Sequence, residues 1–376
     1  MKSIAKVDNF VCTPKSYILD KILVSILLFL SPACLWAQSN IPKYSNEFLA
    51  IGVNARAMSL SNAFTAVADD VTSGYWNPSG LVNLKYDYEG SLMHSQYFAG
   101  IANYDYLGFA TKLDSSSVMG ISVIRFAVDD IPDTRFLYDA NGALNYDNIN
   151  FFSAADYAFL FSYARKLNIL NGIDIGGNVK IIHRNVGNFA NAWGYGLDAG
   201  IQKRFDTWGL GLMVKDLTGT FNAWSHNSEL LVDVYAQTGN VIPDNSIEIT
   251  LPRAILGVYK KWFYKQSFSI LATFDMDFTI DGKRNTIVKS NTVSIDPHGG
   301  LEIGYESKFF LRIGAGQFQN IKNFDGTTYQ TFQHNFGLGI ALKNIGIDYT
   351  LTDIGDQAQS PYSHVVSLKA GFNDKK

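Results

Sequence analysis

Hydrophobic and polar residues alternate with a period of two through most of the chain from about residue 86 onward. In the clearest run, Trp193, Tyr195 and Leu197 face one way, and Gly196 and Asp198 face the other. Such alternation is typical of β-strands with one apolar face. It predicts fourteen strands, at 86–95, 102–112, 117–127, 154–166, 172–183, 192–204, 207–216, 252–262, 267–278, 298–306, 309–318, 330–342, 345–352 and 363–372.

The polar faces of these segments decide between two all-β architectures. A soluble β-sandwich buries its apolar faces in a shared core and presents Lys, Glu and Thr to water. Here the polar faces are rich in Gly, Ser, Asp and Asn. Small or polar lumen residues and segments of about ten residues are typical of transmembrane barrels, which in bacteria have an even number of strands. The predicted fold is therefore an all-β transmembrane antiparallel β-barrel of about 14 strands, over residues 86–376.

The predicted connections differ in length. Short turns at 166–172, 203–207 and 343–344 are typical of the periplasmic rim, whereas the long connections at 128–153, 217–251, 279–297 and 353–362 are expected outside. The 128–153 loop is the predicted partner surface, because binding residues concentrate on loops and interfaces use aromatic anchors. Its candidate residues are Phe136, Leu137, Tyr138 and Tyr146. The aspartates of this loop match no calcium motif, so a solvated loop is favoured over a Ca²⁺ site.

The first 37 residues have the pattern of a secretory signal peptide. Lys15 and Lys21 precede an apolar run at 22–35, and Ala37 is a small residue at a plausible cleavage point before Gln38. The run of about 14 residues is shorter than the roughly 20 needed for a membrane anchor. A lipoprotein signal ending at Cys34 is disfavoured, because the position three residues before it is not aliphatic. We expect a mature outer-membrane protein that begins near Gln38.

Composition supports a membrane barrel and argues against other classes. Charged residues make up only 17% of the chain, against roughly a quarter in soluble domains, while 47% are hydrophobic and 14% aromatic. A net charge of −3 disfavours nucleic-acid binding. Both cysteines, Cys12 and Cys34, lie in the predicted signal peptide, so the mature chain would have no thiol for a disulfide or a metal.

Residues 45–82 do not alternate, and their sequence resembles a known family. The matching residues are Ala55-Arg56-Ala57, Ala68-Asp69-Asp70 and the run at 76–81, with further similarity at 130–134, 152–158 and 162–165. These stretches resemble the PorV/PorQ family, relatives of the FadL-type long-chain fatty-acid channels of bacterial outer membranes. The glycine-rich run that follows the Ala-Arg pair in PorV is replaced here by residues 58–62, so the chain resembles a PorV-like paralogue.

The resemblance implies that residues 38–85 fold back into the barrel as a plug or hatch. The width of a fourteen-stranded barrel supports this independently, because side chains alone cannot fill the lumen, so a buried segment must occupy it or leave a water channel. The candidate hatch residues are Arg56, Phe64, Asp69, Asp70, Tyr75, Trp76, Asn77 and Pro78. The candidate lumen anchors are Lys180, Asp198, Glu302, Arg312, Asp348 and Lys369, and Arg56 is expected to face such a carboxylate or else to cap a turn.

Catalytic motifs are missing from the sequence. It contains no G-x-S-x-G, no H-E-x-x-H and no phosphate-binding loop, and its six histidines are scattered singly. His94-Ser95 and Ser363-His364 are neighbours in predicted strands, where adjacent side chains point to opposite faces. We expect a protein that is not an enzyme and that uses no cofactor or metal.

Two functions remain at this stage. The PorV resemblance implies a partner-binding component or accessory of type IX secretion, whose partners would be the translocon and the carboxy-terminal sorting domains of cargo. The FadL relatives imply instead a channel for hydrophobic small molecules, with lateral opening at a strand irregularity beside the hatch. Outer-membrane lipids are expected partners in both cases, and the secretion role is the favoured prediction.

Overall fold

The computed structural model describes residues 45–138, 141–169, 172–238, 246–265, 267–352 and 363–374. The predicted signal peptide at 1–37 and residues 38–44 of the predicted hatch lie outside these residues. The strands are β1 (Tyr88–Tyr97), β2 (Ala102–Lys112), β3 (Ser117–Asp133), β4 (Asn150–Leu167), β5 (Ile173–Val186), β6 (Ala190–Arg204), β7 (Trp208–Lys215), β8 (Thr220–His226), β9 (Ser246–Thr250), β10 (Arg253–Tyr264), β11 (Phe268–Thr279), β12 (Val288–Lys289), β13 (Ser294–Tyr305), β14 (Phe309–Lys322), β15 (Thr328–Leu342), β16 (Ile345–Thr352) and β17 (Ser363–Phe372). The helices are η1 (Glu47–Leu49), α2 (Ala55–Ser59), α3 (Ser73–Trp76), η2 (Pro78–Asn83), η3 (Tyr146–Asn148) and α4 (Ser228–Thr238).

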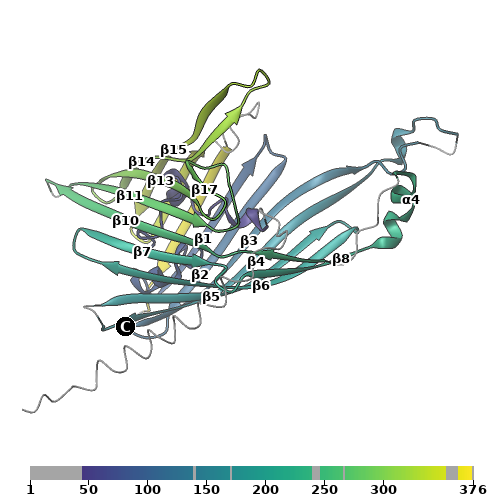
Figure 1. Ribbon diagram of the computed structural model, residues 1–376. Coiled ribbons are helices and arrows are strands. Elements are labelled where there is room, and N and C mark those ends of the chain that lie inside the picture. Colours follow the sequence, from purple (N-terminus) through teal and green to yellow (C-terminus); the bar gives the residue numbers. More distant parts are fainter. Residues whose placement is uncertain are drawn as a thin grey trace, which may run out of the picture. The chain divides into compact units, whose positions relative to one another are not determined.

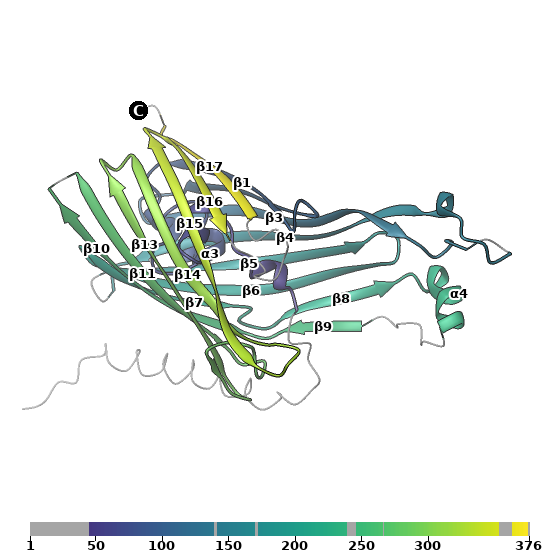
Figure 2. The same cartoon turned by 90° about the horizontal axis from the view of Figure 1, so that it is seen from above.

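The strands between Tyr88 and Phe372 form a closed antiparallel barrel (Figures 1 and 2). The wall strands, β1–β7, β10, β11 and β13–β17, pair in this order around the barrel, and β1 closes the cylinder against β17 with Tyr88 opposite Phe372. β8 continues the line of β7 along β6, β9 pairs with β8, and β12 adds a short pair to β13. Fourteen wall strands therefore remain in the described part of the chain, at the fourteen places that the alternation indicates. The predicted fold class is confirmed.

Three of the predicted long loops contain regular structure, which corrects the sequence reading. The 279–297 connection holds β12 and the first residues of β13. The 128–153 connection begins and ends as strand, because β3 and β4 stay paired as far as Asp133 and Asn150. A bulge between Val128 and Ile131, with Asp130 at a φ of 56°, shifts the register and interrupts the period of two. The 217–251 connection holds β8, α4 and β9, which project beyond the wall beside the β3–β4 hairpin (Figure 1).

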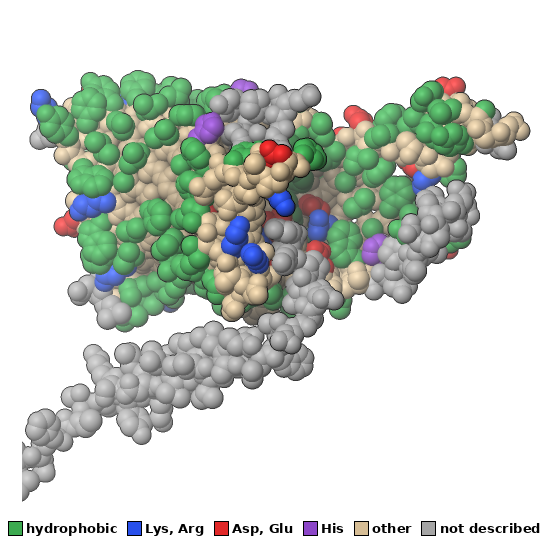
Figure 3. Space-filling model, turned by 45° about the horizontal axis from the view of Figure 1, so that its top comes forward, with side chains coloured by type: hydrophobic (Ala, Val, Ile, Leu, Met, Phe, Trp, Pro, Cys, Tyr) green, Lys and Arg blue, Asp and Glu red, His purple; other side chains and the backbone are tan. Residues whose placement is uncertain are grey.

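The two faces of the wall differ as a membrane barrel requires. Outward side chains such as Trp193, Tyr195 and Leu197 are 50, 61 and 41% exposed, although they are hydrophobic. Figure 3 shows hydrophobic side chains over much of the visible wall. Such a surface is stable against lipid and unfavourable in water. No helix among the described residues is long and apolar enough to cross a membrane.

Residues 45–84, called the hatch below, fill the lumen. Most of their side chains are buried, and the helices α2 and α3 lie inside the ring of strands in Figure 2. Glycines on the inner face let the hatch backbone approach the wall. A Cβ at Gly176 would lie 2.5 Å from the backbone of Pro78 and Ser79, and one at Gly211 would lie 2.5 Å from the carbonyl of Thr65. The glycine-rich polar faces of the sequence therefore make room for the hatch.

Candidate functional site

Arg56 joins the hatch to the wall through a buried chain of ion pairs. Its Nε and Nη2 lie 2.9 and 3.1 Å from the two carboxylate oxygens of Glu302, and its Nη1 lies 3.3 Å from Asp69. Glu302 also accepts a 2.6 Å bond from Arg312, which donates a 2.7 Å bond to Asp348. Burial alone would lower the pKa of Arg56, but Glu302 and Asp69 raise it above its ordinary value, so Arg56 stays charged. Arg56 thus faces a lumen carboxylate, one of the two roles considered for it.

Asp70 makes a second ionic contact with the wall. Its carboxylate lies 2.7 Å from Nζ of Lys369 and also accepts bonds from the backbone and hydroxyl of Thr72. Burial would raise the pKa of Asp70, yet the Lys369 ammonium and these hydrogen bonds outweigh it and lower the pKa to about 2. Asp69, in contrast, is 39% exposed at its side chain and pairs with Arg56 of the hatch at 3.3 Å and with Arg204 of the wall at 4.0 Å.

Two predicted anchors have a different role from the expected one. Nζ of Lys180 lies 3.0 Å from Asp198 and 2.5 Å from Asp216, and all three residues belong to the wall or its connections. The ion pairs of Lys180 and Asp198 therefore stay within the wall and its connections, whereas Glu302 and Lys369 contact charges of the hatch directly. Asn178, next to them, is the residue that reaches the hatch, by donating a 2.8 Å bond to the carbonyl of Gly74.

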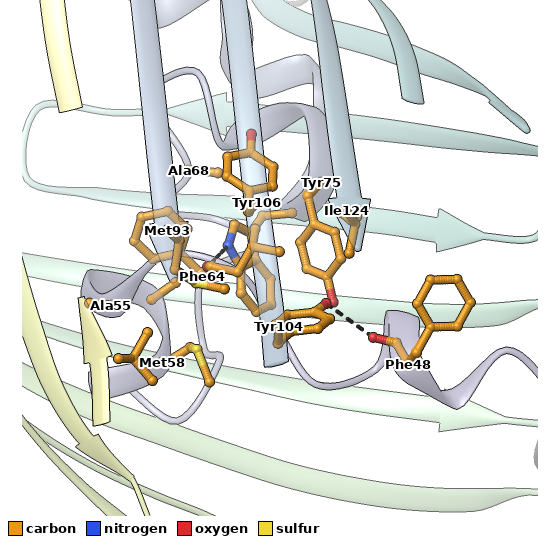
Figure 4. Packing of buried hydrophobic residues seen from close by; sticks show 14 of the residues in the cluster. Phe48, Ala55, Met58, Phe64, Ala68, Tyr75, Met93, Tyr104, Tyr106 and Ile124 are labelled. Carbon is orange, nitrogen blue, oxygen red and sulfur yellow. Dashed lines mark hydrogen bonds between the residues drawn. The ribbon is translucent and has the colours of Figure 1, made fainter. Parts of the chain in front are cut away.

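The aromatic hatch residues pack against one another and against β1–β3 (Figure 4). Trp76 meets Tyr75 and Phe64 edge-on at 4.8 and 6.0 Å between ring centroids. The Tyr75 hydroxyl donates to the carbonyl of Leu49, and the indole nitrogen of Trp76 donates to that of Val53. These polar atoms are satisfied within the hatch, so the aromatic cluster is a stable apolar core.

Asn77 and Pro78 place the hatch against β6 and β7. The buried Asn77 amide donates to the carbonyl of Thr65 at 3.0 Å and is within 3.4 Å of those of Ile201 and Leu212. Its side-chain oxygen accepts from Ser79 and caps η2, which begins with Pro78. This explains the Trp-Asn-Pro-Ser-Gly-Leu run physically, because the run turns the chain and fixes it to the wall.

A cavity of about 280 Å³, here the outer pocket, opens above the hatch on the side of the long connections. Tyr75 and Trp76 lie in its lining, and Nζ of Lys215 lies 4.0 Å from the centroid of the Tyr75 ring. Arg253 and His298 also line it, and His298 lies 3.1 Å from Asp277. A second cavity of about 230 Å³, lined by Arg56, Asp70, Lys85, Lys343, Lys369 and others, lies on the side of the short turns. The hatch therefore separates two polar pockets.

Sequence reasoning missed the polar residues of the outer pocket. Lys215, Arg253, Asp277 and His298 lie near the ends of wall strands, where the alternation does not rank one inward charge above another. One feature of the sequence could have found them. Each occupies a position that the alternating pattern of its strand assigns to the lumen. In the part of the chain that the structure describes, no group of three or more His, Cys, Asp or Glu residues is arranged to hold a metal ion.

The two His-Ser neighbours are split between the two faces of the wall. Ser95 is fully buried in the lumen, where its hydroxyl bonds the carbonyl of His364, whereas His94 faces outward and contacts Asp105 at 2.7 Å. His364 also faces outward, against the Tyr349 hydroxyl at 2.6 Å, while Ser363 is buried. Neither serine meets its neighbouring imidazole.

The predicted partner loop carries exposed aromatic side chains at the end of the β3–β4 hairpin. Phe136, Tyr138 and Tyr146 are 56, 62 and 72% exposed, while Leu137 is half-buried. Arg135 fixes this region to α4, since it pairs with Asp133 at 2.8 Å and donates a 2.7 Å bond to the carbonyl of Leu230. The hairpin end and α4 thus form one connected surface outside the barrel.

Comparison with known proteins identifies the fold. No family model matches the chain, and no curated protein is similar to it in sequence. Among solved structures, the CymD monoaromatic hydrocarbon channel matches with a TM-score of 0.53 at 11% identity, over 86% of this chain and 98% of that one. The fold shared with that protein is a closed transmembrane β-barrel.

Two further solved structures with lower scores are toluene transporters. TodX of Pseudomonas putida has a TM-score of 0.49 at 11% identity, over 86% of this chain and 99% of its own. TbuX of Ralstonia pickettii has a TM-score of 0.45 at 13% identity, over 85% of this chain and 98% of its own. The barrel fold shared with CymD agrees with the predicted fold class, whereas membership of the PorV/PorQ family stays a prediction.

Proposed function

We propose that this barrel is an outer-membrane channel for hydrophobic small molecules, in which the hatch controls passage. This was the second of the two functions that the sequence suggested. The observation that carries the proposal is the apolar layer directly behind the outer pocket. Tyr75 and Trp76 belong both to the pocket lining and to the hydrophobic core of the hatch. A hydrophobic molecule that enters the pocket therefore meets aromatic faces at the place where the pocket ends.

The same apolar layer continues to the wall. Tyr97 and Tyr104 of β1 and β2 lie 6.2 Å apart, and Tyr104 lies 6.0 Å from Phe126 of β3, measured between ring centroids. Phe126 precedes the β3 bulge at 128–131, the kind of strand irregularity at which the FadL relatives open. The fold shared with CymD adds support, because that protein is a hydrocarbon channel. Passage requires the hatch core to move, since its side chains fill the space.

Uptake measurements test this proposal. Cells that express the full-length protein should take up radiolabelled toluene or oleate faster than cells without it. Trp76→Ala and Phe64→Ala should change that uptake several-fold, because both remove aromatic surface from the hatch core. Phe324→Ala is the matched control, since Phe324 is a fully exposed aromatic residue of the β14–β15 connection. Equal uptake with and without the protein would refute the channel.

A partner-binding role in type IX secretion is the second candidate, and one feature favours it. The β3–β4 hairpin presents Phe136, Tyr138 and Tyr146 beyond the barrel, and exposed aromatic residues on a fixed scaffold are typical interface anchors. Deletion of residues 134–148 should then leave barrel assembly intact and reduce capture of translocon components and release of cargo. If capture and secretion are unchanged and uptake depends on Trp76, the secretion role is rejected and only the channel function remains.

A further inference from the structure

A group of basic and aromatic side chains lies on the outward face of the wall, beside the short turn between β6 and β7. Lys260 of β10 is paired directly with Trp208 of β7, and Trp262 is the next outward residue of β10. Lys203 is the last outward residue of β6, and Phe205 follows it in the turn. We call these five residues, Lys203, Phe205, Trp208, Lys260 and Trp262, the basic patch.

The two ammonium groups of the basic patch come together at this turn. Nζ of Lys260 donates a 2.8 Å bond to the hydroxyl of Thr207, and Nζ of Lys203 lies 5.5 Å from the centroid of the Phe205 ring. The rings of Phe205 and Trp208, which neighbour the two lysines, stack at 4.0 Å between centroids. Both positive charges therefore lie beside one aromatic surface at the level of the turn.

The positive charge of the basic patch is not balanced by carboxylates of the wall. Within the described part of the chain, Lys260 has no carboxylate partner. On the short-turn half of the described wall strands, the outward positions carry Arg165 and the two lysines of the patch but no Asp or Glu. The carboxylate nearest in sequence is Asp206, in the exposed part of the turn. The indole N–H groups of Trp208 and Trp262 also have no hydrogen-bond partner among the described residues.

The position of the basic patch on the barrel indicates what it meets. Short turns of bacterial outer-membrane barrels lie on the periplasmic side, and the leaflet on that side consists of phospholipids, some with a net negative charge. Aromatic residues are enriched at such a boundary, and lysines extend their ammonium groups toward the head groups. The outward Leu210 and Ile201, 46 and 44% exposed, lie next to the patch toward the middle of the wall, where acyl chains pack.

We propose that the basic patch binds the head group of an anionic phospholipid of the inner leaflet. The ammonium groups of Lys203 and Lys260 can donate charge-assisted hydrogen bonds to the phosphate oxygens. The unpaired indole N–H groups can donate to the phosphate or to the ester carbonyls. A zwitterionic lipid carries its own cation beside its phosphate, so it gains less from two lysines. The site lies on the outside of the wall, so it does not depend on the channel function proposed above.

Native mass spectrometry of the purified barrel tests the site. The protein in neutral detergent is titrated with phosphatidylglycerol, or with phosphatidylcholine of the same acyl chains, and the dissociation constant of the first bound lipid is measured. One lysine near an anionic lipid contributes roughly five-fold to binding. Phosphatidylglycerol should therefore bind at least about five-fold more tightly than phosphatidylcholine, and this preference should shrink at high salt.

Charge variants place the site on the wall. Lys203→Gln and Lys260→Gln should each weaken phosphatidylglycerol binding about five-fold and leave phosphatidylcholine binding unchanged. Asp206→Asn should strengthen phosphatidylglycerol binding, because it removes the negative charge of the turn. Lys308→Gln is the matched control, since Lys308 lies on another short turn and pairs with Glu306 at 2.9 Å. Heat-modifiable migration on gels shows whether each variant still folds.

Three results would overturn the proposal. The first is equal binding of the two lipids by the parent protein. The second is an equal loss of phosphatidylglycerol binding for Lys260→Gln and Lys308→Gln, which would mean that the turn between β6 and β7 is not the site. The third is displacement of the bound lipid by an equal concentration of inorganic phosphate, which would indicate a site for the free anion and not for a lipid.

Discussion

Replacing Glu302 by Gln should loosen the hatch more than any other single change to its ion pairs. The Glu302 carboxylate accepts three bonds, two from Arg56 and one from Arg312, at 2.6 to 3.1 Å. The Glu302 and Arg312 side chains are only 7 and 2% exposed. The amide keeps the size of the side chain but removes its charge, which leaves two guanidinium groups to share Asp348 and Asp69.

The size of the effect follows from this burial. Breaking a buried ion pair by removing one partner costs about 3–5 kcal/mol, because the other charge stays buried without compensation. If the hatch opens as a unit while the barrel stays closed, this loss raises the population of the open form by roughly 10²- to 5 × 10³-fold. The change acts on the hatch and not on the wall ladder, because Glu302 keeps its backbone pairing with Arg312.

Thiol labelling measures this opening. Ser73 is fully buried in the hatch and its hydroxyl oxygen has no hydrogen-bond partner among the described residues, so Ser73→Cys is a mild probe. A water-soluble maleimide should label it slowly in the parent and about 10²-fold or more faster with Glu302→Gln. Glu306→Gln is the matched control, because Glu306 pairs with Lys308 on an exposed turn where ion pairs contribute little. Labelling rates for Glu302→Gln within two-fold of the parent would refute the reasoning.

Three further perturbations follow from the structure. Because the pKa of Asp70 is about 2 in the folded protein and 3.8 ordinarily, its contacts with Lys369 and Thr72 should stabilise the hatch by about 2 kcal/mol above pH 4, and this contribution should be lost as pH falls to 2. Asp70→Asn should reduce the acid step in the labelling rate, and a step of unchanged size would contradict the prediction. Leu197→Arg should lower the free energy of unfolding in lipid by about 2–4 kcal/mol, measured by urea titration, and a neutral result would mean that Leu197 does not face lipid. Gly176→Ala should increase the rate of hatch labelling, because the added Cβ would lie 2.5 Å from the hatch backbone. Gly90→Ala is the control, since its Cβ would have no heavy atom nearer than 3.8 Å. Equal labelling rates for the two variants would show that the hatch does not pack closely against β5.

The sequence alone was sufficient to predict the wall. Each strand has one face toward lipid and the other toward the lumen, so its sequence must alternate with a period of two, as at Trp193, Tyr195 and Leu197. Fourteen such segments imply a closed barrel, since an open edge has no hydrogen-bonding partner in lipid. The length of the β3–β4 hairpin was missed, because the bulge at 128–131 breaks the alternation on which the prediction depends.

The partners of the charged residues, in contrast, were decided by the tertiary structure. Arg56 and Glu302 are 246 residues apart in the chain, and nothing local selects Glu302 over Asp198 as the partner of Arg56. Register and hatch position bring Glu302 to Arg56 and leave Asp198 beside Lys180. The outward contacts of His94, Asp105 and Arg125 are also a product of pairing, because three separate strands place these residues side by side. Alternation determines which face a side chain occupies, and only the closed barrel determines which side chains meet on that face.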